Sequence, residues 1–224
     1  MDELLRLVNH EAWIEIEGNR AYLKWGHFPK TDGKLDPQCI KRAFVIDPSG
    51  EKRVVIGRDK ESSQRDGLFL EYDAETPYVV CIEIDRGIYS VTSNGKWIFG
   101  DRRFAIGYDV KETRWFKGFA KAYSVNDETK PFIAGFEFEI IPEILKPFKP
   151  EEKLRLKFVF RGRTVRSRVK VCSIEGVEEF EANGTHEITL RKGINVVVAR
   201  YVDEVATGIY DKRNLTSTLT ISVD

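Results

Sequence analysis

The chain has 224 residues, which is enough for two domains of about 100 residues each. Its hydrophobic fraction of 42%, with 12% aromatic residues, can build packed cores and excludes an intrinsically disordered protein. Lys and Arg total 36, as do Asp and Glu, so the formal net charge is zero. We therefore expect no nucleic-acid partner, because phosphate contacts need a basic excess.

Strand patterns dominate the first half of the chain. The segment from Trp13 to Tyr22 alternates apolar and polar residues about a Gly-Asn turn, which predicts a β-hairpin. A second hairpin is predicted over 43–56, and further strand-length runs lie at 21–28, 67–74, 78–87 and 88–99. The segment from Glu112 to Val125 fits a short helix or a strand with a bulge at Gly118, and we expect the strand.

The second half repeats this pattern after a polar linker that follows Val125. Seven short strands are predicted within about 90 residues, separated by turns that contain glycine. The only helices we expect are one short turn at 4–8 and one at 142–146. The sequence thus predicts an all-β protein of two tandem immunoglobulin-like β-sandwich domains, an N-terminal one over 1–134 and a C-terminal one over 135–224.

Several classes of protein find no support in the motifs. The chain has no Gly-x-Ser-x-Gly, His-Glu-x-x-His, Walker A or glycine-rich dinucleotide motif, so we expect a protein that is not an enzyme. Its three cysteines include no Cys-x-x-Cys pair that would predict a structural zinc site. No run of 18 apolar residues occurs, so direct membrane insertion is not expected.

Three histidines are the candidates for metal ligands. His27 follows an aromatic strand in Trp-Gly-His-Phe-Pro, at a strand-to-loop junction that can present an imidazole to a metal. His10 precedes the first predicted strand and is followed by Glu11, which adds a carboxylate ligand. A turn histidine and an exposed terminal histidine are the alternatives for these two. His186 lies on an alternating strand and is expected at the rim or in the core of the second domain.

The four tryptophans all lie in the first half, at positions 13, 25, 97 and 115. Sandwich modules can use exposed tryptophan faces as stacking platforms for sugars. The alternative, that these residues build the core of the first domain, is favoured because they sit within strand patterns. Their distribution predicts that the first domain carries the binding site.

The joint order of four segments resembles an uncharacterised domain family described as the periplasmic component of nickel/cobalt transport systems. These segments are His-Glu-Ala-Trp-Ile-Glu at 10–15, Trp-Gly-His-Phe-Pro at 25–29, Phe-Ala-Lys-Ala-Tyr at 119–123 and Gly-Phe-Glu-Phe-Glu-Ile-Ile-Pro at 135–142. The resemblance covers nearly the whole chain, but no single motif is specific. It departs late in the second domain, where the family often has a histidine and this chain has Ala199-Arg200-Tyr201.

The resemblance implies His10 and His27 as metal ligands, with a third supplied by Glu11 or Asp32. It implies Ni²⁺ or Co²⁺ as the metal, a membrane metal transporter as the partner, and an extracytoplasmic location, periplasmic or at the cell surface. The chain as written shows no secretory signal. The functional prediction is a non-enzymatic binding protein for a divalent transition metal that is accessory to metal uptake. The alternative is a structural or adhesive sandwich module that binds protein or polysaccharide.

Overall fold

The computed structural model describes residues 10–58 and 68–224, and within them it is built almost entirely from β-strands. The strands of the first unit are β1 (Glu11–Glu17), β2 (Arg20–Gly26), β3 (Ile40–Asp47), β4 (Gly50–Arg53), β5 (Val55–Arg58), β6 (Leu68–Glu71), β7 (Tyr78–Thr92), β8 (Trp97–Phe99) and β9 (Val110–Ser124). The strands of the second unit are β10 (Phe138–Pro142), β11 (Lys153–Phe160), β12 (Arg163–Thr164), β13 (Arg166–Cys172), β14 (Val177–Asn183), β15 (Thr185–Thr189), β16 (Gly193–Asp203) and β17 (Lys212–Val223).

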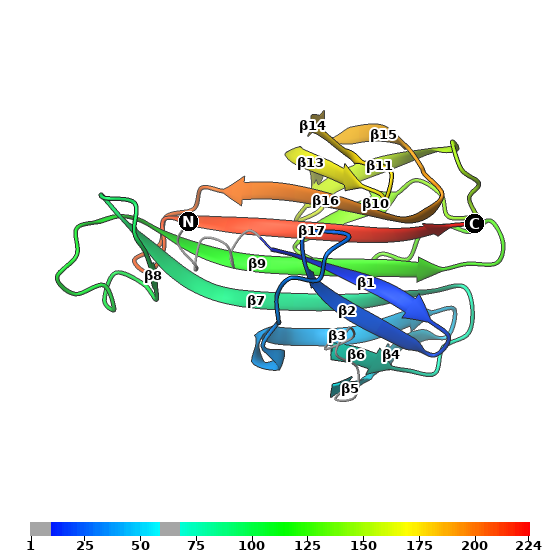
Figure 1. Ribbon diagram of the computed structural model, residues 1–224, viewed down its shortest axis with the longest axis horizontal. Coiled ribbons are helices and arrows are strands. Elements are labelled where there is room, and N and C mark those ends of the chain that lie inside the picture. The colour runs from blue at the N-terminus through cyan, green and yellow to red at the C-terminus, as the bar shows by residue number, and fades with distance from the viewer. Residues whose placement is uncertain (1–9, 59–67) are drawn as a thin grey trace.

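The strands form two sheets, and Figure 1 shows how they are layered. A four-stranded sheet in the order β1-β2-β6-β5 packs over the β3, β7 and β9 part of a 13-stranded sheet. The large sheet runs on through β17, β16, β13, β14, β15 and β11 to β10. It curls until β10 lies against β17, where the Ile140 N–H donates to the Ser217 hydroxyl over 3.3 Å. The predicted all-β class and the sandwich-like layering of the sheets are confirmed.

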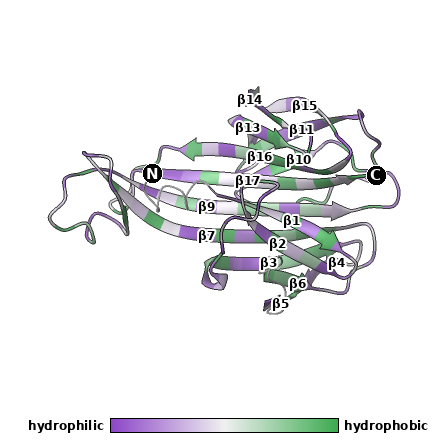
Figure 2. Ribbon diagram, viewed as in Figure 1, coloured by the Kyte–Doolittle hydropathy of each residue, from purple (hydrophilic) through white to green (hydrophobic). Residues whose placement is uncertain are grey.

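Alternation explains why these segments are strands. In β11, Leu154, Leu156 and Phe158 are buried while the lysines and the arginine between them are exposed. Figure 2 shows the same banding of hydrophobic and hydrophilic residues along the long strands. One core fills the curled second unit and extends to Phe44, Val79, Cys81 and Phe119 of the first unit. Another core fills the space between the four-stranded sheet and β3, β7 and β9.

The boundary between the two units is crossed by main-chain hydrogen bonds. β17 pairs in parallel with β9 from Lys212↔Arg114 to Thr220↔Ala122, so one sheet belongs to both units. The predicted division between residues 134 and 135 falls in the connection between β9 and β10. Whether the two parts fold independently stays a prediction, although the shared sheet argues for a single cooperative structure.

β1 is held on this shared sheet by threonine hydroxyls. Thr218 donates its hydroxyl proton to the Ala12 carbonyl over 2.6 Å, and the Ile14 N–H donates to the Thr220 hydroxyl over 3.3 Å. The same face of β17 carries Thr216, whose hydroxyl accepts a hydrogen bond from Arg86. One face of β17 therefore fixes the start of the chain's first described strand.

Two local expectations were wrong. The segment 142–146, predicted as a short helix, ends β10 at Pro142 and continues as a non-helical connection that bridges to Thr129 through Leu145. The segment 112–125 is a strand as predicted, but Gly118 pairs regularly with Ile84. The β7–β9 ladder is instead irregular at two other places, between Asp85 and Gly87 and between Val91 and Thr92. No helix among the described residues is long and apolar enough to cross a membrane.

Candidate functional site

His10 and His27 come together in the structure. Their ring centroids lie 4.8 Å apart in an edge-to-face arrangement, although the residues are separated by the whole β1–β2 hairpin. Residue 10 immediately precedes β1 and residue 27 immediately follows β2, and the antiparallel register pairs Glu11 with Gly26. A two-residue turn at Gly18 and Asn19 sets this register, so the hairpin places the two histidines side by side.

Asp32 completes a cluster with the two histidines. One of its oxygens, Oδ2, lies 3.3 Å from His27 Nδ1, and the other, Oδ1, lies 3.7 Å from His10 Nε2. The His27 N–H also donates to Oδ1 over 3.2 Å, which fixes the carboxylate. Burial raises the pKa of Asp32, but the hydrogen bond with His27 and the charges of both histidines outweigh it, so its pKa lies below the ordinary value.

Glu11 does not join this cluster, contrary to its predicted place among the metal ligands. Its carboxylate is buried against the second unit, 2.6 Å from Lys170 Nζ and 2.7 Å from Arg200 Nη2. Adjacent residues of an extended chain point to opposite sides, so His10 and Glu11 cannot face the same ligand. The structure therefore brings together His10, His27 and the alternative ligand Asp32.

Glycines allow the cluster to be this compact. A Cβ atom at Gly33 would lie 2.6 Å from His10 Nδ1 and 2.7 Å from Trp25 Cδ1. A Cβ at Gly26 would lie 2.4 Å from Asp32 Oδ1 and from the Lys30 carbonyl oxygen. Both side chains would have to displace a member of the cluster or its supporting backbone.

Gly33→Ala is expected to destabilise the fold by about 1–3 kcal/mol, because the added methyl group overpacks the space beside His10 and Trp25. Gly208→Ala is the matched control, since a Cβ there meets nothing within 4 Å. The control should change stability by no more than about 0.5 kcal/mol. Urea unfolding of both variants measures the difference, and equal stabilities would contradict the close packing described around His10.

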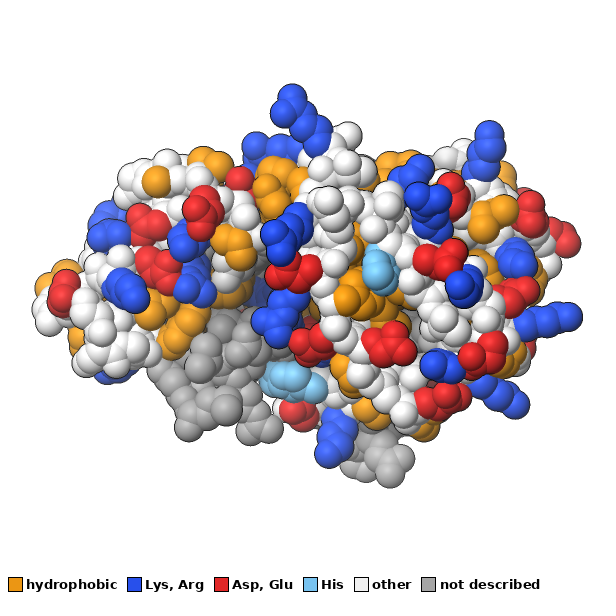
Figure 3. Space-filling model, turned by 90° about the horizontal axis from the view of Figure 1, so that it is seen from above, with side chains coloured by type: hydrophobic (Ala, Val, Ile, Leu, Met, Phe, Trp, Pro, Cys, Tyr) orange, Lys and Arg blue, Asp and Glu red, His pale blue; other side chains and the backbone are white. Residues whose placement is uncertain are grey.

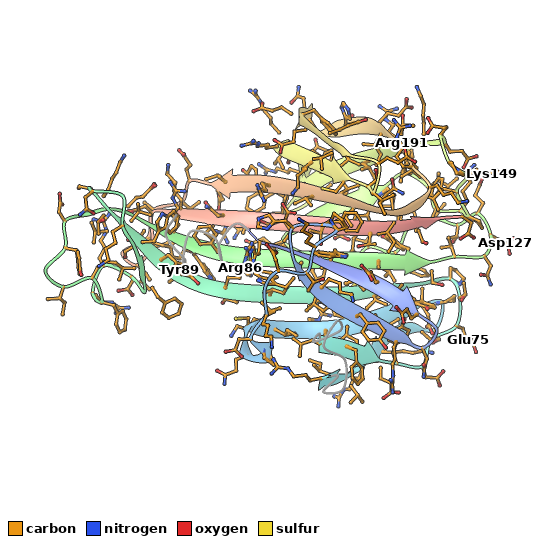
Figure 4. All side chains as sticks on the ribbon, viewed as in Figure 1. Glu75, Arg86, Tyr89, Asp127, Lys149 and Arg191 are labelled. Carbon is orange, nitrogen blue, oxygen red and sulfur yellow. The ribbon has the colours of Figure 1, made fainter. Side chains whose placement is uncertain are left out.

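A buried arginine, Arg86, contacts the main chain of His10 and the ring of Trp25 beside the cluster. Arg86 is the extra residue of the β7 bulge, and its Nη1 donates to the His10 carbonyl over 3.0 Å. Its guanidinium lies 5.3 Å from the Trp25 ring centroid. Complete burial, with the charge of Arg200 adding to it, lowers the pKa of Arg86 to about 10. Figure 4 labels Arg86 on β7, between the sandwich and the projecting end of the molecule. Sequence reasoning missed this residue because no motif marks a bulge.

The third histidine lies elsewhere. His186 is in β15 and stacks on Phe180, with ring centroids 3.8 Å apart. This agrees with the expectation of a rim or core residue in the second unit. Figure 3 shows histidine side chains at two separate places on one face, among interspersed cations and anions.

Two of the four tryptophans are too deeply buried to form stacking platforms. Trp13 and Trp25 are buried, and Trp97 packs against Tyr89 and Phe116. Trp115 is partly buried and donates its indole N–H to Asp85 over 2.8 Å. The alternative that these residues build the core of the first domain is therefore confirmed for Trp25, whereas Trp13 packs against Cys172, Val196 and Val198 of the second unit.

A second candidate surface lies at the far end of the β7–β9 ribbon, which Figure 1 shows projecting beyond the four-stranded sheet. Four large apolar or aromatic side chains are exposed there, and we call them the tip surface. They are Phe99 (63% exposed), Phe104 (72%), Ile106 (85%) and Tyr108 (46%). The sequence offered a signal in the apolar run Phe-Ala-Ile-Gly-Tyr at 104–108, which lies in a turn and not in a strand.

Hydrogen bonds hold the tip surface in one conformation. The Phe104 N–H donates to the Asp101 carbonyl over 3.0 Å, and the Tyr108 N–H donates to the Ala105 carbonyl over 3.1 Å. Arg102 ties the loop to the start of β17 through a 2.7 Å ion pair with Asp211. Phe104, Ile106 and Tyr108 are therefore presented by a hydrogen-bonded turn with a polar margin, which follows Phe99 at the end of β8.

A hollow of ≈ 300 Å³ in the second unit is a weaker candidate. It is lined by Val171, Ser173, Glu175, Gly176, Val177, Glu178, Thr189 and Arg191. Arg191, labelled in Figure 4, lies within 4.0 Å of the carboxylates of Glu151, Glu175 and Glu178. Its charge is thus already balanced by the protein.

Comparisons with known proteins add little to this geometry. No family model matches the chain, and no curated protein matches it. Among solved structures, it is similar to a two fibronectin type-III domain segment from chicken tenascin. That similarity has 12% sequence identity, covers 93% of this chain and 97% of the other, and has a TM-score of 0.23. The resemblance to the nickel/cobalt transport family stays a prediction.

Proposed function

We propose that this protein is a non-enzymatic β-sandwich interaction module that binds a protein partner through the tip surface. The observation that carries the proposal is the exposure of Phe99, at the end of β8, and of Phe104, Ile106 and Tyr108 in the projecting turn that follows. Soluble proteins seldom expose several large apolar side chains together unless the patch meets a partner. Protein interfaces commonly centre on such aromatic and aliphatic anchors.

The chemistry of the tip surface favours a protein over a polysaccharide. Polysaccharide stacking would use broad aromatic faces, and Trp25, an earlier candidate for that role, is buried. Phe104 and Ile106 are wholly apolar, whereas Arg102, Arg103 and Asp101 form ion pairs around them. An apolar centre with a charged margin is the usual arrangement of a protein interface.

The double variant Phe104→Ser with Ile106→Ser is expected to weaken partner binding by at least about tenfold, because each side chain would lose its apolar contact. The matched control is Ile133→Ser with Ile174→Ser, which removes two exposed apolar side chains outside the tip surface. A partner isolated by crosslinking to the wild-type chain would be purified and titrated against all three proteins. Equal dissociation constants for the wild type and the tip variant would contradict the proposal.

The histidine cluster favours a second candidate function, the binding of a divalent transition-metal ion. Its support is the convergence of His10, His27 and Asp32, whose potential ligand atoms all lie within 4.8 Å of one another. Calorimetric titration of chelator-stripped protein with Zn²⁺, Ni²⁺ and Co²⁺, with Ca²⁺ as control, tests this function. Binding heat with the transition metals and none with Ca²⁺ would support it, and no heat with any metal would exclude it.

A further inference from the structure

The spacing of the donor atoms in the histidine cluster suits a metal ion of a particular size. Ligands of a tetrahedral Zn²⁺ ion with bonds near 2.0 Å lie about 3.3 Å from one another. Asp32 Oδ2 lies 3.3 Å from His27 Nδ1, and Asp32 Oδ1 lies 3.7 Å from His10 Nε2. One donor atom from each of the three side chains lies within 4.8 Å of the other two, so the imidazoles and the carboxylate would close around the ion by side-chain rotation.

Contacts outside the cluster hold the ring of His10 and the main chain that carries His27 and Asp32. The main-chain carbonyl of His10 accepts a hydrogen bond from buried Arg86. The imidazole ring of His10 lies against Trp25, with ring centroids 6.0 Å apart. His27 forms a two-way main-chain bridge with Lys30, which closes the loop that carries Asp32. Preorganised ligands cost less entropy when an ion binds, so this support favours affinity.

The three residues differ in their access to solvent. His10 is 3% exposed, whereas the side chain of His27 is 46% exposed and that of Asp32 is 28% exposed. An ion held between them would rest on the buried imidazole and face water on its other side. Three protein ligands with a solvent side leave coordination positions that water or another molecule can occupy.

We infer that His10, His27 and Asp32 form a three-ligand, solvent-open site for a divalent transition-metal ion of the Zn²⁺, Ni²⁺ and Co²⁺ class. Two imidazoles and one carboxylate are donors that these ions accept and that Ca²⁺ accepts poorly. The inference deepens the second candidate function and rests on it. It assigns the third ligand to Asp32 and leaves Glu11 in its ion pairs with Lys170 and Arg200.

The test uses the full chain, stripped of metal with a chelator, and Co²⁺ as the spectroscopic probe. Titration should give visible absorption bands that saturate at one ion per chain, with a matching rise in melting temperature. His27→Ala and Asp32→Asn should each weaken Co²⁺ and Zn²⁺ binding by at least about tenfold. Both positions are partly exposed, so folding of each metal-free variant can be verified by circular dichroism before the titration.

His186→Ala is the matched control, because it removes an imidazole that stacks on Phe180 in the other unit. This variant should bind metal as the wild type does. Metal binding that survives unchanged in His27→Ala would overturn the assigned site while leaving a metal-binding function standing elsewhere in the chain. Absence of any spectral change or heat with all three metals would overturn both the site and the second candidate function.

Discussion

Replacement of Glu139 by Ala is expected to lower the free energy of unfolding by about 3–5 kcal/mol, because it leaves a buried lysine without its counter-ion. Lys121 Nζ lies 2.6 Å from Glu139 Oε1, and both side chains are almost completely buried. The carboxylate also accepts hydrogen bonds from the Ala134 and Gly135 N–H groups. Burial lowers the pKa of Lys121, but Tyr123 and the Glu139 carboxylate outweigh it, so its pKa lies above the ordinary value.

An exposed pair with the same chemistry provides the control. Lys153 and Glu187 also form a cross-strand ion pair, at 2.9 Å, but their side chains are 68% and 52% exposed. Glu187→Ala should lower the free energy of unfolding by no more than about 1 kcal/mol, since exposed ion pairs contribute little to stability. Urea unfolding of both variants measures the contrast. Similar losses in the two would show that burial does not set the importance of the Lys121–Glu139 pair.

Trp13→Ala should also lower the free energy of unfolding strongly, by about 3–5 kcal/mol. The indole is 1% exposed and packs across the two units against Cys172, Val196 and Val198. Because β9 and β17 belong to one sheet, the loss should shift the unfolding of the entire chain and not of the first unit alone.

Two spectroscopic probes can distinguish unfolding of the whole chain in one transition from separate unfolding of the two units. Trp25 packs against His10, and Trp97 packs against Tyr89 and Phe116, so the fluorescence of these two residues reports on the first unit, whereas far-ultraviolet circular dichroism reports on both units. In wild type and in Trp13→Ala the two transitions should coincide, and both should move to lower urea concentration in the variant. A circular-dichroism component that stays at the wild-type midpoint would show independent domains divided near residue 134.

Local patterns predicted seven of the eight strands of the second unit, all but the two-residue β12. Each of its seven predicted segments contains an observed strand, because alternation such as that of Leu154, Leu156 and Phe158 reflects a buried face directly. The pairing of β9 with β17 could not be predicted, since both strands are buried on two faces and nothing local specifies their partner. The bulge at Arg86 was misplaced onto Gly118 for a related reason: a glycine in a strand is an ambiguous signal.

The candidate site could be predicted in part. His10 and His27 were identified because histidines are few and lie at strand ends, and the β1–β2 hairpin places them together. Glu11 was chosen as a neighbour in sequence, although strand geometry puts adjacent side chains on opposite faces. Asp32 was available as an alternative, but only the turn after His27 shows that it reaches both rings.

The parallel pairing of β9 with β17 also affects how the chain folds during synthesis. A ribosome releases β9 before any strand of the second unit, while β17 comes after all the other strands of that unit. One edge of β9 therefore has no neighbour until the second unit has been translated. Such long-range pairing slows folding and leaves a strand edge open to association with other nascent chains. The polar threonines of β17 that later fix β1 are thus in place only at the last stage of assembly.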